Sequence, residues 1–158
     1  MQIVAVSDTH GRNEVFQELR LRHPQASAFL HCGDSETDEY ALDGFVSVQG
    51  NNDYYSSHPM EIILNLEGVR LYMTHGQYLR HFNRIESLIL KAKEHQCTLV
   101  LHGHTHIFDV QELDGITLVN PGSLYHNRDG SSPCYALITI LGGRISVQRI
   151  DYPRFKTK

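Results

Sequence analysis

The stretch IVAVSDTHG, residues 3–11, establishes the pattern on which the fold depends. It opens with a short, β-branched, apolar run, which predicts a buried strand, and it closes with a polar turn. Residues 13–22 follow with apolar side chains at the spacing of a helix. The chain therefore begins as a strand, a loop and a helix.

The same arrangement, an apolar run closed by a polar turn, recurs along the chain. Residues 26–32 end at GD, residues 45–49 end at GNND, residues 69–74 end at HG, and residues 98–101 lead into GHTH. Between the last two runs, residues 82–94 carry apolar side chains at helical spacing. Five predicted strands therefore end in polar loops.

Three hairpins are predicted where two strand-like runs are joined by a short turn. The paired runs are residues 61–66 with 69–74, 108–113 with 116–119, and 134–141 with 144–150. Strand–helix units first and hairpins later favour a mixed, partly parallel sheet packed on a mostly antiparallel one, with helices outside. We therefore expect an α/β fold, of the α+β type, with two central sheets.

Size and composition limit the functions that the chain can have. Its 158 residues, 41% apolar and 20% charged, predict a single globular domain over residues 1–158. The net charge of -4 argues against strong nucleic-acid binding or an anionic membrane surface. No apolar run reaches the roughly 18 residues that a membrane-spanning helix needs. The expected partner is small or neutral, and no membrane is involved.

The cysteines and the N-terminal residues favour a cytoplasmic protein. Cys32, Cys97 and Cys134 are odd in number and form no CxxC pair, so they predict neither a disulfide framework nor a thiolate zinc site. We expect Cys32 to pack as a small hydrophobic side chain. The first residues lack the basic segment and cleavage site of a signal peptide.

Histidine is unusually frequent, with eleven residues against six phenylalanines. Asp8 and His10 are two residues apart, as are His104 and His106, and in an extended segment this spacing turns both side chains to one side. Loops that follow neighbouring strands meet at one edge of an α/β sheet, where ligand sites form. Taken singly, GD and GNND are equally typical of tight turns. GHTH is a more specific indication of a metal site.

Other polar residues have a structural interpretation beside the functional one. His31 and His102 lie in apolar strand sequence and are expected in the core or near the site, not as ligands. Arg84 could join a cationic rim, although a solvated charge at a helix start is the favoured interpretation. Arg12 follows Gly11 at a predicted helix start and could meet an anion there.

Read together and in this order, the motifs DTHG, GD, GNND, HG and GHTH resemble those of the calcineurin-like metallophosphoesterase superfamily. The short chain is similar to the small, single-domain phosphodiesterase branch of that superfamily. The resemblance runs from Asp8 to Ser123 and includes NPGS at residues 120–123. It implies the metallophosphatase fold, a four-layer α/β/β/α sandwich with two central mixed β-sheets.

The resemblance also implies a metal-dependent phosphoesterase, above all a phosphodiesterase, that acts on a small phosphoester substrate with two divalent metal ions. The implied ligands are Asp8, His10 and His106 for one ion, Asn51, His75 and His104 for the other, and Asp34 between them. Imidazole and carboxylate ligands without thiolate favour Mn, Fe, Zn, Co or Ni over Ca or Mg, and relatives suggest Mn. Two such ions would activate a bridging water for attack on phosphorus.

The match departs from the superfamily at one position in particular. Asn52 stands where many members carry a histidine, and an amide cannot act as a general acid. The implied catalytic residues are Asp34, Asn51, Asn52 and Asp53. An alternative is an interaction scaffold on the same fold, which would predict eroded ligands, whereas all seven are present here. Relatives suggest a homodimer or a tetramer.

Overall fold

The computed structural model describes residues 1–42 and 44–153, and its strands form two five-stranded sheets. The first sheet consists of β1 (Gln2–Val6), β2 (Ala28–His31), β3 (Phe45–Ser47), β9 (Cys134–Leu141) and β10 (Arg144–Asp151). Their order is β10-β9-β1-β2-β3. β1, β2 and β3 run parallel, and β9 is antiparallel to both of its neighbours. The three parallel strands therefore end at the same edge of this sheet.

The second sheet consists of β4 (Glu61–Leu66), β5 (Val69–Thr74), β6 (Leu99–Leu101), β7 (Phe108–Leu113) and β8 (Ile116–Pro121), in the order β4-β5-β6-β8-β7. β5, β6 and β8 are parallel, and β4 and β7 are antiparallel edge strands. The expectation of a mostly antiparallel second sheet is therefore wrong. The helix between β5 and β6 supplies the long crossover that a parallel pair requires, and the hairpin β9–β10 joins the first sheet instead.

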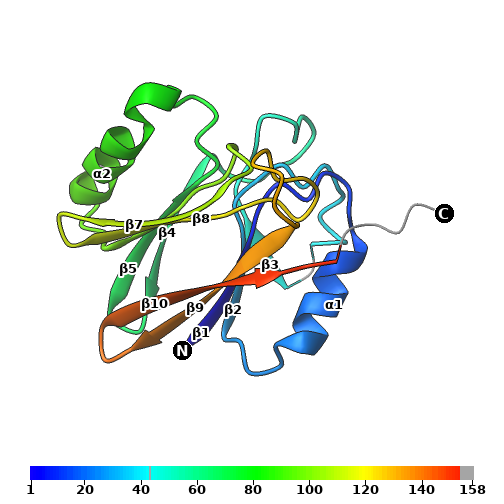
Figure 1. Cartoon of the computed structure of the whole chain (residues 1–158), viewed down its shortest axis with the longest axis horizontal. Helices are drawn as coiled ribbons and strands as arrows, with labels where there is room; N and C mark the ends of the chain where they lie inside the picture. The colour runs from blue at the N-terminus through cyan, green and yellow to red at the C-terminus, as the bar shows by residue number, and fades with distance from the viewer. Residues whose placement is uncertain (43, 154–158) are drawn as a thin grey trace.

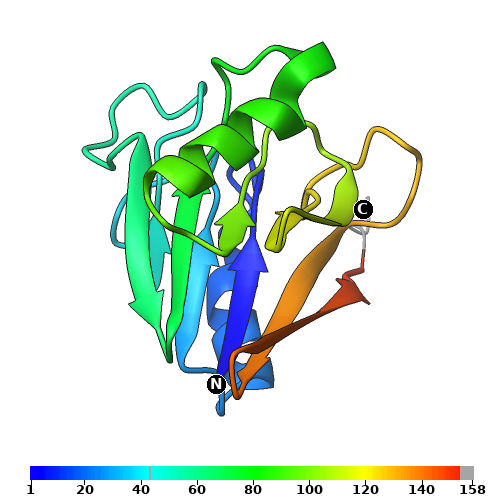
Figure 2. The same ribbon diagram turned by 90° about the vertical axis from the view of Figure 1, so that its left-hand side faces the viewer.

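The two sheets pack face to face around an apolar core, and one helix covers the outer face of each (Figures 1 and 2). Along β1, Ile3 and Ala5 point into the core between the sheets, whereas Val4 and Val6 pack against α1 (Glu14–Arg22). All four side chains are fully buried. A strand covered on both faces has no polar position, which explains its unbroken apolar run.

The second helix, α2 (Arg84–Glu94), covers the other sheet and follows a short 3-10 turn, η1 (His81–Asn83). Leu88 and Ala92 of α2 pack on Tyr72 and Val100. The layers are therefore helix, sheet, sheet and helix, as expected for a four-layer sandwich. Among the described residues, no helix is long and apolar enough to cross a membrane.

The loops that follow the parallel strands gather at one end of the sandwich, the upper end in Figures 1 and 2. Within each sheet, backbone hydrogen bonds join neighbouring loops: Asp8 N–H donates to Gly33 O, His10 N–H to Asp34 O and Gly103 N–H to His75 O. Between the sheets, Leu124 N–H donates to Ser7 O. Polar residues from β1, β2, β3, β5 and β6 are thereby brought together.

Candidate metal centre

Carboxylate and imidazole groups converge where these loops meet. His106 Nε2 lies 3.1 Å from Asp8 Oδ1 and 3.1 Å from His10 Nε2. His75 Nε2 lies 3.5 Å from Asp34 Oδ2 and 3.8 Å from Asp8 Oδ1. The side chains form two groups that share Asp8, one with His10 and His106 and one with Asp34 and His75, and in each group the potential ligand atoms lie within 4.8 Å of one another.

Asn51 and His104 complete the set that the sequence suggested. Asn51 Oδ1 lies 3.1 Å from His75 Nε2 and 3.1 Å from His104 Nδ1. His10 Nε2 is 4.0 Å from Asp34 Oδ2, so Asp34 faces both sides of the cluster. The structure therefore brings all seven expected ligands into one cluster at the end of the sandwich.

Three of the histidines are oriented by a hydrogen bond from Nδ1. His75 Nδ1 donates to Cys32 O at 2.7 Å, His10 Nδ1 to Glu36 at 2.6 Å, and His106 Nδ1 to the backbone carbonyl of His126 at 2.9 Å. A neutral imidazole that donates from Nδ1 keeps the lone pair on Nε2. All three Nε2 atoms face the cluster, which is the arrangement that orients histidine for a metal ion.

Asp8 supplies a test of whether a cation fits this site. Its Oδ2 atom accepts hydrogen bonds from Ser7 Oγ at 2.6 Å and from the His104 N–H at 3.1 Å. Its Oδ1 atom is buried and has no hydrogen-bond donor among the described residues, although buried acceptors are nearly always satisfied. The lone pairs of neighbouring Nε2 atoms converge on the same place. A divalent cation fits this donor set because it would satisfy the orphaned oxygen and these lone pairs together.

Asp34 is held in its ionised form. Asn52 donates to it twice, from the backbone N–H to Oδ1 at 2.8 Å and from Nδ2 to Oδ2 at 2.9 Å. Without a metal ion, burial alone would raise the pKa of Asp34, but a protonated His75 and the hydrogen bonds from Asn52 outweigh it and hold the pKa far below its ordinary value. Asn52, which the sequence placed among the implied catalytic residues, therefore orients the carboxylate of Asp34.

Asp53, which the sequence also placed among the catalytic residues, has a buried carboxylate directed at the loop backbone. Its Oδ2 accepts from the N–H groups of Asp34 and Gly50, both at 2.8 Å, and its Oδ1 accepts from the Glu36 N–H at 2.9 Å. The carboxylate thereby joins the loop after β2 to the loop after β3.

The backbone of the ligand loops is itself unusual. Five of the seven expected ligands have φ in the left-handed region, which non-glycine residues rarely adopt. They are Asp8 (52°), His10 (44°), Asp34 (58°), His104 (74°) and His106 (57°). Such conformations persist only where the surrounding structure enforces them, and they cluster at functional sites.

Two glycines make the close approach of these loops possible. A Cβ atom on Gly50 would lie 2.1 Å from Asp34 Oδ1, and one on Gly33 would lie 2.7 Å from His75 Nδ1. Neither position can carry a side chain without moving an expected ligand. The glycines that precede the Asp34 and Asn51 positions in the sequence motifs therefore have a steric role.

Arg84 corrects the sequence interpretation, which placed its charge in solvent or on a cationic rim. Its side chain is only 5% exposed. The guanidinium donates to Gly76 O at 2.7 Å, to His75 O at 2.9 Å and to Gly103 O at 2.6 Å, while Nε donates to His102 Nδ1 at 3.2 Å. Burial lowers the pKa of Arg84 to about 10. Arg84 thus connects the loop that carries His75 to the loop that carries His104 through hydrogen bonds to their backbones.

Arg12 is likewise not an anion site. Its guanidinium is buried and donates to the backbone carbonyls of Leu124 and Pro153, both at 2.7 Å, and its Nε donates to Glu14 at 2.9 Å. It joins the loop after β1 to two distant segments. By contrast, His31, His102 and Cys32 are buried as expected.

The buried His31 should make stability depend on pH. Its Nδ1 accepts from the Gly33 N–H at 3.0 Å, and burial lowers its pKa to about 4. Because the unfolded chain binds a proton near pH 6.5 and the folded chain does not, the free energy of unfolding falls as the pH falls through this interval. The contribution of His31 between pH 7 and pH 5 is about 2 kcal/mol.

Urea unfolding of the metal-free protein at pH 7 and pH 5 measures this dependence. His31→Gln, whose amide does not titrate, should lose less stability on acidification than the wild type does. The exposed His81→Gln serves as the control and should retain the wild-type dependence. An unchanged pH dependence in His31→Gln would show that His31 is not responsible.

Comparison with known proteins identifies the family of the chain. The family model described as the calcineurin-like phosphoesterase superfamily domain matches residues 1–143. A probable metallophosphoesterase of Bacillus subtilis is 30% identical over 96% of this chain and 91% of its own length. A crystal structure from Streptococcus pneumoniae, described as a predicted phosphoesterase, is 28% identical with a TM-score of 0.88, covering 95% of this chain and 88% of that one.

More distant structures share the fold. An archaeal phosphodiesterase, 19% identical, superposes with a TM-score of 0.73 over 95% of this chain and 100% of its own. A vacuolar sorting protein of Entamoeba histolytica, solved in complex with zinc, is 20% identical with a TM-score of 0.74 over 96% of this chain and 99% of its own. The extent of the family match and the identity to the Bacillus relative establish that the chain belongs to the calcineurin-like phosphoesterase superfamily.

Proposed function

We propose that the chain is a phosphodiesterase that requires two divalent metal ions. The observation that carries this proposal is the buried, unpartnered Oδ1 of Asp8, which faces the Nε2 atoms of His10, His75 and His106. Membership of the calcineurin-like phosphoesterase superfamily indicates the class of reaction, the hydrolysis of phosphate esters. The archaeal phosphodiesterase of the same fold supports the choice of diesters.

In this proposal each cation has its own donors and shares one carboxylate. Asp8, His10 and His106 would hold the first, Asn51, His75 and His104 would hold the second, and Asp34 would be a ligand of both. The donor set is of the kind that binds Mn, Fe, Zn, Co or Ni, and Mn is our first choice. When bound, such ions supply a polarised phosphoryl oxygen and a water of lowered pKa.

The remaining polar residues orient this donor set. Asn52 fixes both oxygens of Asp34, and Asp53 fixes the loops on either side of it. An amide at position 52 can donate a hydrogen bond but cannot protonate a leaving alkoxide. We therefore expect esters with good leaving groups, such as p-nitrophenyl diesters, to be hydrolysed faster than alkyl esters.

Metal reconstitution tests this function. The purified chain is stripped with a chelator, reloaded with Mn²⁺, Zn²⁺ or Ni²⁺, analysed for metal content, and assayed with bis(p-nitrophenyl) phosphate and p-nitrophenyl phosphate. Two ions per chain and metal-dependent hydrolysis that favours the diester are the expected result. A fully loaded protein that hydrolyses neither ester at any pH from 6 to 9 would contradict it.

A non-catalytic scaffold is the second candidate, because the fold is shared with a vacuolar sorting protein. This function predicts a stable complex with another protein and no metal-dependent hydrolysis. The hydrolysis assay described above separates the two candidates, because the vacuolar sorting protein of this fold was itself solved with zinc and bound metal alone does not distinguish them.

A further inference from the structure

A cavity of about 490 Å³ opens directly beside the candidate metal centre, and its lining differs chemically from that of the centre itself. Two tyrosines, two glutamines and two of the expected metal ligands line it. They are Gln49, Asn51, Tyr54, Gln77, Tyr78 and His104. This volume is within the range of small-molecule sites, and we call it the tyrosine–amide cavity.

The tyrosine–amide cavity offers aromatic surface and amides in place of charge. Tyr54 and Tyr78 are 78% and 81% exposed, although side chains of this size are usually covered. Its described lining contains no lysine or arginine, and the carboxylate of its one acidic residue, Asp53, is occupied by backbone N–H groups. Such a lining suits an uncharged planar group, which stacks on aromatic side chains whatever its substituents.

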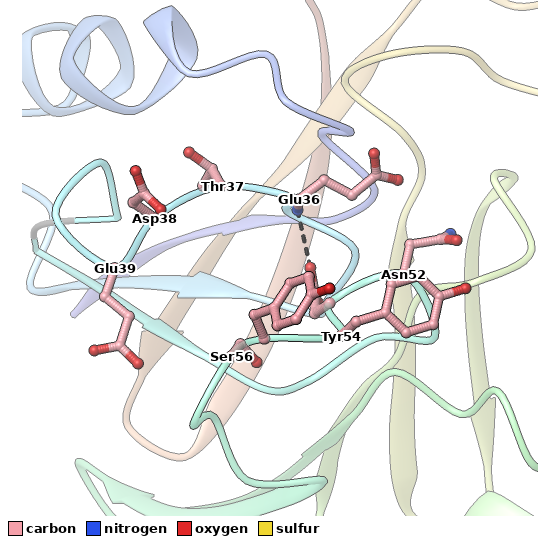
Figure 3. A pocket seen from close by; sticks show the side chains of 9 residues that line it. Glu36, Thr37, Asp38, Glu39, Asn52, Tyr54 and Ser56 are labelled. Carbon is pink, nitrogen blue, oxygen red and sulfur yellow. Dashed lines mark hydrogen bonds between the residues drawn. The ribbon is translucent and has the colours of Figure 1, made fainter.

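The neighbouring cavities indicate which end of a substrate lies where. A second cavity, which shares Asp53 and Tyr54 with the first, is lined by residues 36–39 and 52–56. Figure 3 shows Asp38 and Glu39 across from Tyr54 and Asn52. These carboxylates disfavour a second phosphate on this side. A third cavity of about 450 Å³, beside His10 and His106, is lined by both Arg128 and Glu36. The Glu36 carboxylate accepts a hydrogen bond from His10 Nδ1, and Arg128 makes this cavity more favourable than the second one for extra negative charge.

We propose that the tyrosine–amide cavity binds an uncharged planar ring of the ester substrate, either an aryl group or a nucleobase. This inference rests on the proposed phosphodiesterase function, because it places the phosphate at the metal centre and the ring beside Asn51 and His104. Tyr54 and Tyr78 then determine specificity: they select diesters that carry a ring over those with two alkyl groups.

Kinetics of a double variant test the inference. In the Mn²⁺-loaded enzyme, Tyr54→Leu/Tyr78→Leu should raise the KM for bis(p-nitrophenyl) phosphate about tenfold or more, since stacking is worth that much per ring. The inhibition constant of inorganic phosphate should stay within about twofold of the wild-type value, because phosphate has no ring. Tyr40→Leu, at a tyrosine that is 94% exposed and lines none of the three cavities, is the matched control.

Binding of free rings separates this inference from the proposed function. Saturation-transfer NMR with adenosine and with p-nitrophenol, on protein with and without Mn²⁺, should give signals that the double variant loses, and the stronger signal identifies the nucleobase or the aryl group. Ring binding in a protein without esterase activity would retain the inference about the cavity and refute the function. An active double variant with wild-type KM and wild-type ring binding would overturn the inference and leave the function intact.

Discussion

Replacing Asp34 with asparagine is expected to abolish metal-dependent hydrolysis while leaving the protein folded. Asp34 is the carboxylate that we propose to be shared by the two ions, with Oδ2 3.5 Å from His75 Nε2 and 4.0 Å from His10 Nε2. Its pKa is held far below the ordinary value by His75 and Asn52. An amide retains its size but removes the negative charge. Because residues that only orient a metal ligand are worth about 10- to 100-fold in metal affinity, loss of the proposed bridging ligand should lower the metal affinity by more than about 100-fold.

Metal titration by calorimetry and thermal unfolding of the metal-free protein are the measurements for Asp34→Asn. Glu112→Gln makes the same change of carboxylate to amide at an exposed position of β7 and should change neither quantity. If Asp34→Asn retained two ions per chain and full activity, Asp34 would not be a ligand and the bridged arrangement would be wrong.

Replacing Arg84 with methionine should destabilise the protein and weaken metal binding together. The buried guanidinium satisfies three backbone carbonyls, at His75, Gly76 and Gly103. Leaving these acceptors without a donor should lower the free energy of unfolding by roughly 3–5 kcal/mol. Because the loops of His75 and His104 lose their common support, metal affinity should also fall about 10- to 100-fold.

Arg84→Lys distinguishes the shape of the guanidinium from its charge. Lysine keeps a buried cation but cannot donate along several fixed directions, so it should recover part of the stability and little of the metal affinity. Arg80→Met removes an exposed arginine four residues earlier and should change neither measurement. Wild-type metal affinity in a folded Arg84→Met protein would limit Arg84 to a purely structural role.

The sequence predicted the elements well wherever one local pattern determined the structure. The apolar run of β1, the hairpin of β4 and β5 and the helical spacing of α2 each lie within a few residues of their observed bounds. The pairing of strands within the sheets was predicted less well. The parallel pairing of β6 with β5 depends on the path of α2 over the sheet, and its pairing with β8 depends on the placement of β7 between them in the chain. The pattern of a single short strand encodes neither.

At the candidate site, the sequence suggested which residues meet but not what holds them. The family resemblance that the motifs carry was enough to group Asp8 with His106, which are far apart in the chain and 3.1 Å apart in space. The left-handed φ of these residues and the burial of Arg84 arise from contacts between loops, and helix-start arginines are usually exposed. One feature of the sequence is consistent with the burial of Arg84: position 76 is a glycine, and the absence of a Cβ atom there leaves room for the guanidinium.

The assembly of the cluster from five separate loops has a thermodynamic consequence. Its members range from Asp8 to His106. Each of the two potential ligand groups combines segments of the chain that lie close together only when the strands of the sheets are paired. An unfolded chain therefore holds no preformed site, and metal ions bind the native state almost exclusively. Above saturation, each tenfold increase in free metal should add about 1.4 kcal/mol to the free energy of unfolding per bound ion. The concentration of free metal should therefore determine the stability of the folded chain as well as the activity proposed above.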